Sequence, residues 1–136
     1  TEIGQMTTLQ ELFIYQNKLN GTIPEELFQL RQLESLALHS NHFEGTVSSQ
    51  FHELKNLREL YLSKNMFDGS VPEQLGRLEN LKILSLIDNN LGGFMPSEIC
   101  QLRQTADLKT LSSDCGGTYP QIQCKLHACC TECGDT

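Results

Sequence analysis

LRELYLSKNMFDGSVPEQLGRLEN, residues 57–80, is one of four successive copies of a 24-residue pattern. The other copies begin at Leu9, Leu33 and Leu81 and keep the same order of apolar residues, asparagine and glycine. Self-similarity at a fixed period of this length is typical of solenoids, in which each copy forms one turn and stacks on its neighbours. The repeat therefore predicts four stacked turns, here called rungs one to four, over residues 9–104.

Each rung has apolar residues at its first, fourth and sixth positions, as in Leu57, Leu60 and Leu62. This alternation predicts a strand with one buried face, and stacking pairs the strands into a parallel sheet over a shared core. The ninth residue is always asparagine, whose amide can donate and accept hydrogen bonds between turns. The thirteenth is always glycine, which allows a sharp bend at positive φ. These columns are Asn17, Asn41, Asn65 and Asn89, and Gly21, Gly45, Gly69 and Gly93.

The four rungs resemble the plant-type leucine-rich repeat, whose motif LxxLxLxxNxLxGxIPxxLxxLxx they match. The resemblance implies an α/β-type leucine-rich repeat solenoid, with a parallel sheet on its concave face and short 3₁₀ turns on its convex side. It places short second strands around Thr22-Ile23, Thr46-Val47 and Ser70-Val71. Two departures, Ser48 in place of proline and the bulky pair Phe94-Met95, predict an irregular second ladder in those rungs. The resemblance also implies binding, because family members mostly serve as receptor ectodomains or secreted inhibitors.

The two ends of the chain are expected to differ. Residues 1–8 align with the tail of a preceding repeat, because Ile3 and Met6 occupy apolar positions of the motif. We therefore expect a processed product or part of a longer protein, with an exposed edge that invites further repeats or a partner. Residues 105–136 break the period and read as a cysteine-rich cap, to which Leu108 and Leu111 contribute a last strand.

The cap holds five of the six cysteines, and Cys100 lies just upstream on rung four. Dense cysteines in a segment with little apolar content predict three disulfides in an oxidising compartment. The pairing stays open, although Cys100 is a natural staple between rung four and the cap, and the adjacent Cys129 and Cys130 are expected to pair elsewhere. The six cysteines are Cys100, Cys115, Cys124, Cys129, Cys130 and Cys133. Their order resembles the C-terminal cap of secreted leucine-rich repeat proteins from algae.

Zinc is the alternative for these cysteines. The soft ligands in question are Cys124, Cys129, Cys130, Cys133 and His127. Their spacing is not that of two CxxC knuckles, and adjacent cysteines fit poorly into one tetrahedral site. We therefore expect disulfides, and neither a metal nor a cofactor.

Charge and hydropathy exclude two classes of partner. The net charge of −7 opposes nucleic-acid binding, which needs a basic surface. No apolar run approaches the roughly 20 residues of a membrane-spanning helix. The motif Asn20-Gly21-Thr22 is a candidate glycosylation site at Asn20, although Asn-Gly also suits the turn that the repeat requires.

The third, fifth, seventh and eighth residues of each rung are expected to face outward on the concave sheet. Because successive rungs lie about 4.8 Å apart at the sheet, each of these positions forms a column, and the columns include several aromatic and aliphatic side chains. A cluster of this kind on an exposed sheet favours an interface, although packing between neighbouring strands would also account for it. The predicted partner-binding residues are Phe13, Tyr15, His39, Tyr61, Lys64, Ile83 and Ile87.

Catalytic alternatives are weaker. Glu11 and Glu59 are expected two strands apart, about 10 Å, which exceeds the carboxylate separation of glycosidases. His39 has Ser40 beside it, but the two project differently and no orienting acid is expected nearby. The remaining histidines, His42, His52 and His127, are scattered.

The leading hypothesis is a non-enzymatic, secreted or lumenal recognition module that binds a protein or glycan partner through the concave sheet. The alternative is a structural or accessory subunit of a large assembly, extracellular or in another oxidising space such as the thylakoid lumen. An inhibitor of a secreted hydrolase is a third and weaker hypothesis.

Overall fold

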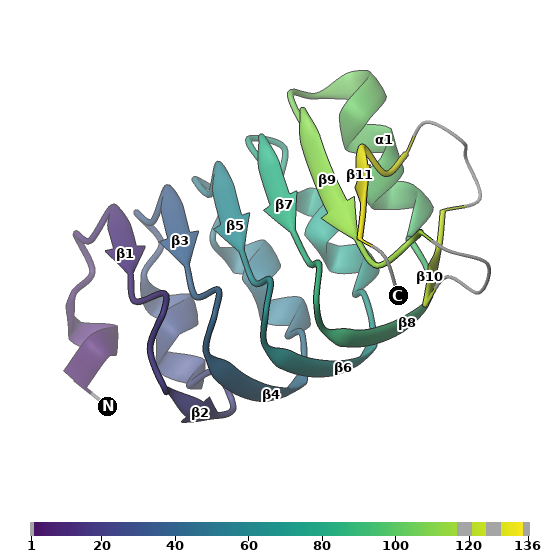
Figure 1. The fold of residues 1–136 in the computed structure, drawn as a ribbon. Coiled ribbons are helices and arrows are strands. Elements are labelled where there is room, and N and C mark those ends of the chain that lie inside the picture. The colour runs from purple at the N-terminus through teal and green to yellow at the C-terminus, as the bar shows by residue number, and fades with distance from the viewer. Residues whose placement is uncertain (1, 117–120, 125–128, 135–136) are drawn as a thin grey trace.

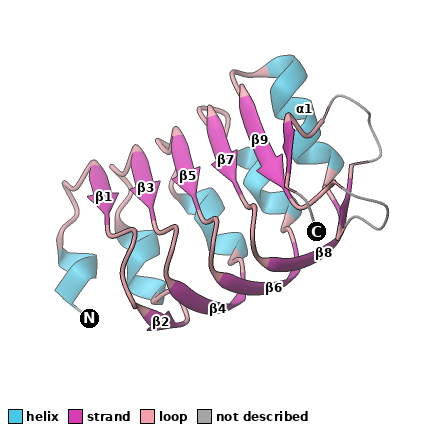
Figure 2. Cartoon of the chain, in the orientation of Figure 1, coloured by secondary structure: helices cyan, strands magenta, loops and turns pink. Residues whose placement is uncertain are grey.

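The structure is a computed structural model that describes residues 2–116, 121–124 and 129–134. Figure 1 shows the rungs lying side by side from the N-terminus to the C-terminus, with one row of strands along each of two faces. Helical elements form the remaining side, behind the first row of strands (Figure 2). The expected leucine-rich repeat solenoid is confirmed.

The first sheet is parallel throughout and carries one strand from each rung. Its order is β1 (Glu11–Phe13), β3 (Ser35–Ala37), β5 (Glu59–Tyr61), β7 (Ile83–Ser85), β9 (Thr110–Ser113) and β11 (Glu132–Cys133). Equivalent residues pair, so that Glu11, Ser35 and Glu59 lie in one row across the sheet. Leu111 is a buried residue of β9, so the cap contributes the expected strand, but Leu108 precedes it and the edge of the sheet is β11 rather than β9.

The second sheet is also parallel and continuous. Its order is β2 (Asn20–Gly21), β4 (His42–Thr46), β6 (Met66–Ser70), β8 (Asn90–Phe94) and β10 (Ile122–Gln123). The predicted positions were late by a few residues, since β4 and β6 end where their centres were expected. The reason is that Val47 and Val71 are buried and lead directly into the helical side.

The predicted irregularity of this ladder is wrong, because β4, β6 and β8 pair without interruption. Ser48 takes the place of proline at the start of its 3₁₀ helix with φ −66°, close to the −67° of Pro24 and the −73° of Pro72. Its hydroxyl also accepts a hydrogen bond from the Gln50 N–H at 3.1 Å. Serine therefore reproduces the proline backbone and adds a cap.

The convex side consists of 3₁₀ helices, as expected, and one α-helix. They are η1 (Glu2–Gln5), η2 (Glu25–Gln29), η3 (Ser49–Glu53), η4 (Glu73–Arg77) and α1 (Ser97–Thr105). α1 packs against η4 so closely that a Cβ on Gly76 would lie 2.5 Å from the Glu98 Cβ. Only glycine at position 76 allows this approach.

The asparagine column links neighbouring rungs through hydrogen bonds. The Asn65 Nδ2 donates to the Leu62 carbonyl of its own rung and to the Leu38 carbonyl of the preceding rung, both at 3.1 Å. Its Oδ1 accepts from the Phe43 N–H at 3.0 Å. Asn41 and Asn89 make the equivalent bonds, so buried backbone groups are satisfied where the chain leaves each strand.

The core is most complete in the middle of the solenoid. Leu57, Leu60 and Leu62 of rung three are fully buried. Their equivalents in rung one, Leu9, Leu12 and Ile14, are half-buried because β1 is an edge strand.

Three disulfides hold the cap, which confirms the cysteine prediction. They are Cys100–Cys129, Cys115–Cys133 and Cys124–Cys130. Cys100 on α1 is the expected staple, and the adjacent Cys129 and Cys130 pair with different partners. The four cysteines of the zinc alternative are thus divided among three disulfides, and His127 lies outside the described residues.

Candidate functional site

The predicted partner-binding residues lie on the outward face of the first sheet and just beyond its strands. Phe13 and Tyr15 are 52% and 44% exposed, and Lys64 is also exposed. The other four are half-buried: His39, Tyr61, Ile83 and Ile87. The largest exposed apolar area on this face therefore belongs to rung one.

Three aromatic rings from successive rungs contact one another. The Tyr15 and His39 rings are stacked, with centroids 4.6 Å apart and planes 8° from parallel. The Tyr61 ring meets His39 edge to face at 5.8 Å. We call Phe13, Tyr15, His39 and Tyr61 the aromatic platform. Edge-to-face and offset stacked pairs stabilise such an arrangement beyond simple burial, so the rings are held in place before any partner arrives.

Small residues lie beneath the platform. Ser35 and Ala37 of rung two are 7% and 3% exposed, because larger side chains from rungs one and three flank them. The Ser35 hydroxyl donates to the Glu59 Oε2 at 2.9 Å, which holds that carboxylate on the sheet. The surface offered to a partner thus includes ring faces and edges and carboxylate oxygens, together with the exposed Gln16 and Lys64.

Burial and neighbouring charge set the protonation of the platform. Burial lowers the pKa of His39 below its usual 6.5, and the Lys64 ammonium lowers it further. The imidazole is therefore neutral near pH 7, and its buried Nδ1 has no hydrogen-bond partner among the described residues. Burial, followed by the charge of Glu59, raises the pKa of Tyr61, so the phenol keeps its proton.

The C-terminal part of the same face has a different character. Serines replace the aromatics, and the Ser112 hydroxyl donates to the Ser85 hydroxyl at 3.1 Å. The cap leans over Ile87, since a Cβ on Gly134 would lie 2.9 Å from the Ile87 Cγ2. The structure therefore brings Tyr15, His39 and Tyr61 together and sets Ile87 apart, beneath the cap. Sequence columns alone could not reveal that cover, because the cap does not follow the repeat.

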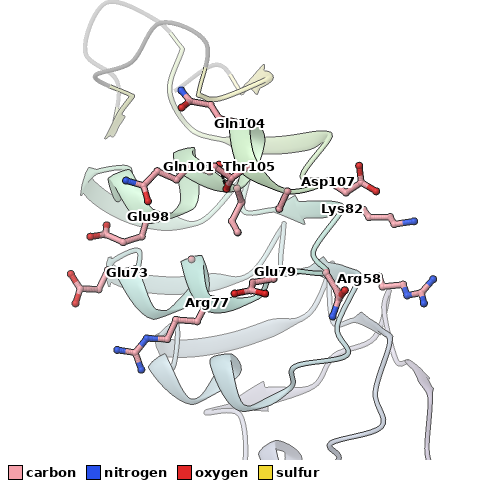
Figure 3. A pocket seen from close by; sticks show the side chains of 14 residues that line it. Arg58, Glu73, Arg77, Glu79, Lys82, Glu98, Gln101, Gln104, Thr105 and Asp107 are labelled. Carbon is pink, nitrogen blue, oxygen red and sulfur yellow. Dashed lines mark hydrogen bonds between the residues drawn. The ribbon is translucent and has the colours of Figure 1, made fainter.

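A hollow lies on the convex side, where α1 meets η4 (Figure 3). Its volume is about 1180 Å³, and its rim carries both signs of charge. The charged side chains are Arg58, Arg77 and Lys82, and Glu73, Glu79, Glu98 and Asp107. Figure 3 shows them fanning outward rather than converging on one point, so the hollow is an open polar groove. Sequence analysis missed it, although a signal was present: Leu108 follows Leu81 by 27 residues instead of 24, and the longer connection accommodates α1.

The other candidate sites are placed as follows. Glu11 and Glu59 lie in one row with Ser35 between them, two strand spacings apart. Asn20 and Thr22 of the glycosylation motif are exposed at the edge strand β2. In the cap, the sulfur atoms of Cys115, Cys124 and Cys130 lie within 4.8 Å of one another, a cluster that the sequence spacing does not predict. All three sulfurs are engaged in disulfides.

Comparisons with known proteins agree with this architecture. Two leucine-rich repeat family models match residues 8–30 and 31–91. A search of curated proteins found no match. Within the part of the chain that the structure describes, no helix is long and apolar enough to cross a membrane.

Three solved structures show the range of similar proteins. The ectodomain of the receptor kinase SOBIR1 from Arabidopsis thaliana is 34% identical with a TM-score of 0.70, over 78% of this chain and 55% of that one. A plant ice-binding protein is 34% identical with a TM-score of 0.73, over 82% and 35%. The Arabidopsis HAESA ectodomain, solved with an IDA peptide hormone ligand, is 28% identical with a TM-score of 0.70, over 80% and 18%. The chain thus spans 55% or less of each of these three proteins.

Proposed function

The chain belongs to the leucine-rich repeat family, and we propose that it is a non-enzymatic recognition module that binds a polypeptide partner through the aromatic platform. The observation that carries this proposal is the exposed, pre-stacked set of rings on the first sheet. Aromatic side chains give large contact area at small entropic cost and are the residues on which binding energy concentrates. The peptide-bound HAESA ectodomain supports a polypeptide ligand for a solenoid of this type.

The compartment proposed is extracellular. Three disulfides need an oxidising environment, and the similar receptor ectodomains support the same compartment. Lys64 and Ile83 are proposed to form the margin of the platform, whereas Ile87, the remaining predicted partner-binding residue, lies apart from it beneath the cap. Glycosylation at Asn20 also remains a proposal, favoured by the exposure of Asn20 and Thr22.

The test is selection of displayed peptides on the folded protein, followed by affinity measurements on two double variants. Phe13→Ala with Tyr61→Ala should weaken the selected peptides by about thirtyfold, the loss expected when hot-spot contacts worth about 2 kcal/mol are removed. The matched control is Met66→Ala with Phe94→Ala, which removes exposed apolar side chains from the second sheet. Unchanged affinity in the first variant, or equal loss in both, contradicts the assignment.

A structural or accessory role predicts a different result. In that case the native protein, extracted gently and without reductant, should run as one subunit of a large stoichiometric assembly. A monomer, or a complex with one polypeptide, supports the recognition module.

A second candidate function is binding to ice, as named for one of the similar plant proteins. The observation that favours it is the outward column Thr22, Thr46 and Ser70 along the second sheet, with the Thr22 and Thr46 methyl groups each lying over a glycine of the next rung. Glu44 and Asp68 project from the same strands, and their hydrated charges oppose adsorption to ice. Inhibition of ice recrystallisation that is lost in Thr46→Glu would favour this candidate; no inhibition by the native protein would exclude it.

A further inference from the structure

We propose that the partner segment taken by the aromatic platform is basic, a stretch of polypeptide rich in arginine. This inference rests on the proposed function and specifies the chemistry of its ligand. Its evidence is the placement of carboxylates beside aromatic rings on one face of the first sheet.

The outward positions of the four rungs carry an excess of negative charge. Glu11, Glu59 and Asp88 occupy these positions, against the single cation Lys64. The chain as a whole has a net charge of −7. His39 adds no positive charge near pH 7, because burial and Lys64 lower its pKa. Charge of this sign attracts a cationic partner and repels an acidic one.

Carboxylates and rings are paired along the same strands. Glu11 and Phe13 are two residues apart in β1, and Glu59 and Tyr61 are two residues apart in β5, about 6.6 Å in each case. The charge of Glu59 also contributes to the raised pKa of Tyr61, which agrees with this proximity. A guanidinium group can contact a ring face and donate to a carboxylate at once, and its positive charge strengthens both contacts relative to those of a neutral side chain.

The Tyr15 ring offers a stacking surface of its own. His39 covers one face of this ring in a nearly parallel stack, while Tyr15 remains 44% exposed. A planar guanidinium could stack on the exposed part of the Tyr15 ring, which His39 already supports. Arginine suits this position better than lysine, because its planar group stacks on aromatic rings and is more weakly hydrated than an ammonium group.

A glycan is the rival occupant of this surface. Sugar rings also stack on aromatic side chains, but they need hydrogen-bond donors and acceptors around them. The Ser35 hydroxyl beneath the platform already donates to Glu59, and the small residues Ser35 and Ala37 are covered. The Glu11 and Glu59 carboxylates lie beside ring surfaces, the pairing that favours a cation. The exposed Gln16 and Lys64 are the amide and ammonium groups that a glycan would have to use.

The experiment compares three synthetic probes on the folded protein: an arginine–glycine peptide, a glutamate–glycine peptide of the same length, and a neutral cello-oligosaccharide. The arginine peptide should bind at least tenfold more tightly than either of the others. Replacing its arginines with lysine should weaken binding, because the stacking contact is lost. Equal binding of the arginine and glutamate peptides, or tighter binding of the oligosaccharide, overturns the proposal.

Two charge variants distinguish contacts made at the aromatic platform from the effect of the protein's net charge. Glu11→Gln with Glu59→Gln and Glu44→Gln with Asp68→Asn each remove two negative charges, but only the first pair lies on the first sheet. Glutamine at position 59 keeps an oxygen that can accept the Ser35 hydrogen bond, so the fold is retained. The first variant should lose about tenfold in affinity for the arginine peptide, and the second should stay near the native value. Equal loss in both variants would overturn the proposal, because only net charge would then matter.

The outcome also separates this inference from the proposed function. If displayed peptides selected on the native protein depend on Phe13 and Tyr61 but show no excess of arginine, the recognition platform stands and the basic partner is wrong. If no selected peptide depends on the platform, the proposed function itself fails.

Discussion

Asp114 closes the hydrogen-bond ladder at the C-terminal end of the solenoid. Within the solenoid, the N–H of each ninth residue donates to a carbonyl of the next rung, as Asn65 does to Asp88 at 3.2 Å. At rung four the Asp88 and Asn89 N–H groups instead donate to the two carboxylate oxygens of Asp114, at 3.0 and 3.2 Å. One buried side chain thus takes the place of two backbone carbonyls of a following rung.

Asp114→Asn should therefore destabilise the protein although it changes only one atom. An amide has a single oxygen, so one N–H would face the NH₂ group and lose its acceptor. A buried donor left without an acceptor costs about 1–3 kcal/mol. Urea unfolding should show this loss, and hydrogen exchange should show it at the Asp88 and Asn89 amides. Asp107→Asn, at an exposed position, is the control; equal stability of the two variants would contradict the role of Asp114.

His39 should titrate below the usual histidine pKa of 6.5, with Lys64→Gln raising its pKa. The groups around the ring are Tyr15, Tyr61 and Lys64, and only the last carries positive charge. Because the folded protein holds the neutral form, His39 contributes stability above about pH 6.5 that is lost as the pH falls through its folded pKa. Titration of the imidazole signals by NMR gives the test. A pKa that does not rise in Lys64→Gln would remove the charge effect from the explanation.

At the scale of elements, rung four differs from the others because α1 replaces a 3₁₀ helix. α1 can pack on η4 only because position 76 has no side chain. A Cβ there would lie 2.5 Å from the Glu98 Cβ and 2.7 Å from its backbone carbonyl carbon. The backbone of α1 cannot yield as a flexible side chain would, so the contact is rigid.

Gly76→Ala should cost about 1–3 kcal/mol, the usual range for overpacking. Gly92→Ala is the matched control, since its Cβ would meet the Gln121 carbonyl oxygen at an ordinary 3.6 Å. That second variant should be neutral or slightly stabilising, because alanine reduces the entropy of the unfolded chain. Thermal and urea unfolding of the two proteins measure the difference; similar losses would show that packing against Glu98 is not the cause.

The repeat predicts elements well and their ends poorly. The spacing of Leu57, Leu60 and Leu62 is enough to place β5, because one strand face must be buried in every rung. The second strands were predicted a few residues late, since Val71 resembles a strand residue in the motif but leads into η4. Such boundaries depend on backbone geometry that apolar patterning does not encode.

The candidate site was predictable as columns but not as contacts. Stacking of rungs places Tyr15, His39 and Tyr61 in neighbouring rungs from sequence alone. Their ring geometry, the cover of Ile87 by Gly134 and the role of Asp114 required the cap, which follows no period. The sequence thus predicts the features that recur in every rung, whereas contacts that occur only once are revealed by the structure.

The whole molecule is asymmetric along its axis. At one end β1 and β2 are edge strands over half-buried apolar residues such as Leu12 and Ile14. At the other end the cap adds β11 and β10 to the two sheets and is held by three disulfides. The aromatic platform lies in rungs one to three, away from the cap, so ligand binding and cap integrity should be separable.

The three disulfides should differ in both accessibility and contribution to stability. Cys100 and Cys129 are 5% and 3% exposed, whereas Cys133 is exposed, so a limited amount of reductant should open Cys115–Cys133 before Cys100–Cys129. Alkylation and peptide mass spectrometry give the order.

The chain-entropy relation assigns about 3–4 kcal/mol of stability to Cys100–Cys129, whose cysteines are 29 residues apart. It assigns about 2 kcal/mol to Cys124–Cys130, whose cysteines are 6 residues apart.

Full reduction should therefore loosen the solenoid from the cap inward. Amides of β9 and β7 should exchange with solvent faster than before, while those of β3 and β5 keep their protection, because the latter rely on rung stacking and the asparagine column. Binding of a platform ligand should survive reduction as long as rungs one to three stay folded. Hydrogen exchange before and after reduction provides the measurement. Uniform loss of protection across all strands would instead mean that the solenoid unfolds as one cooperative unit whose stability depends on the cap.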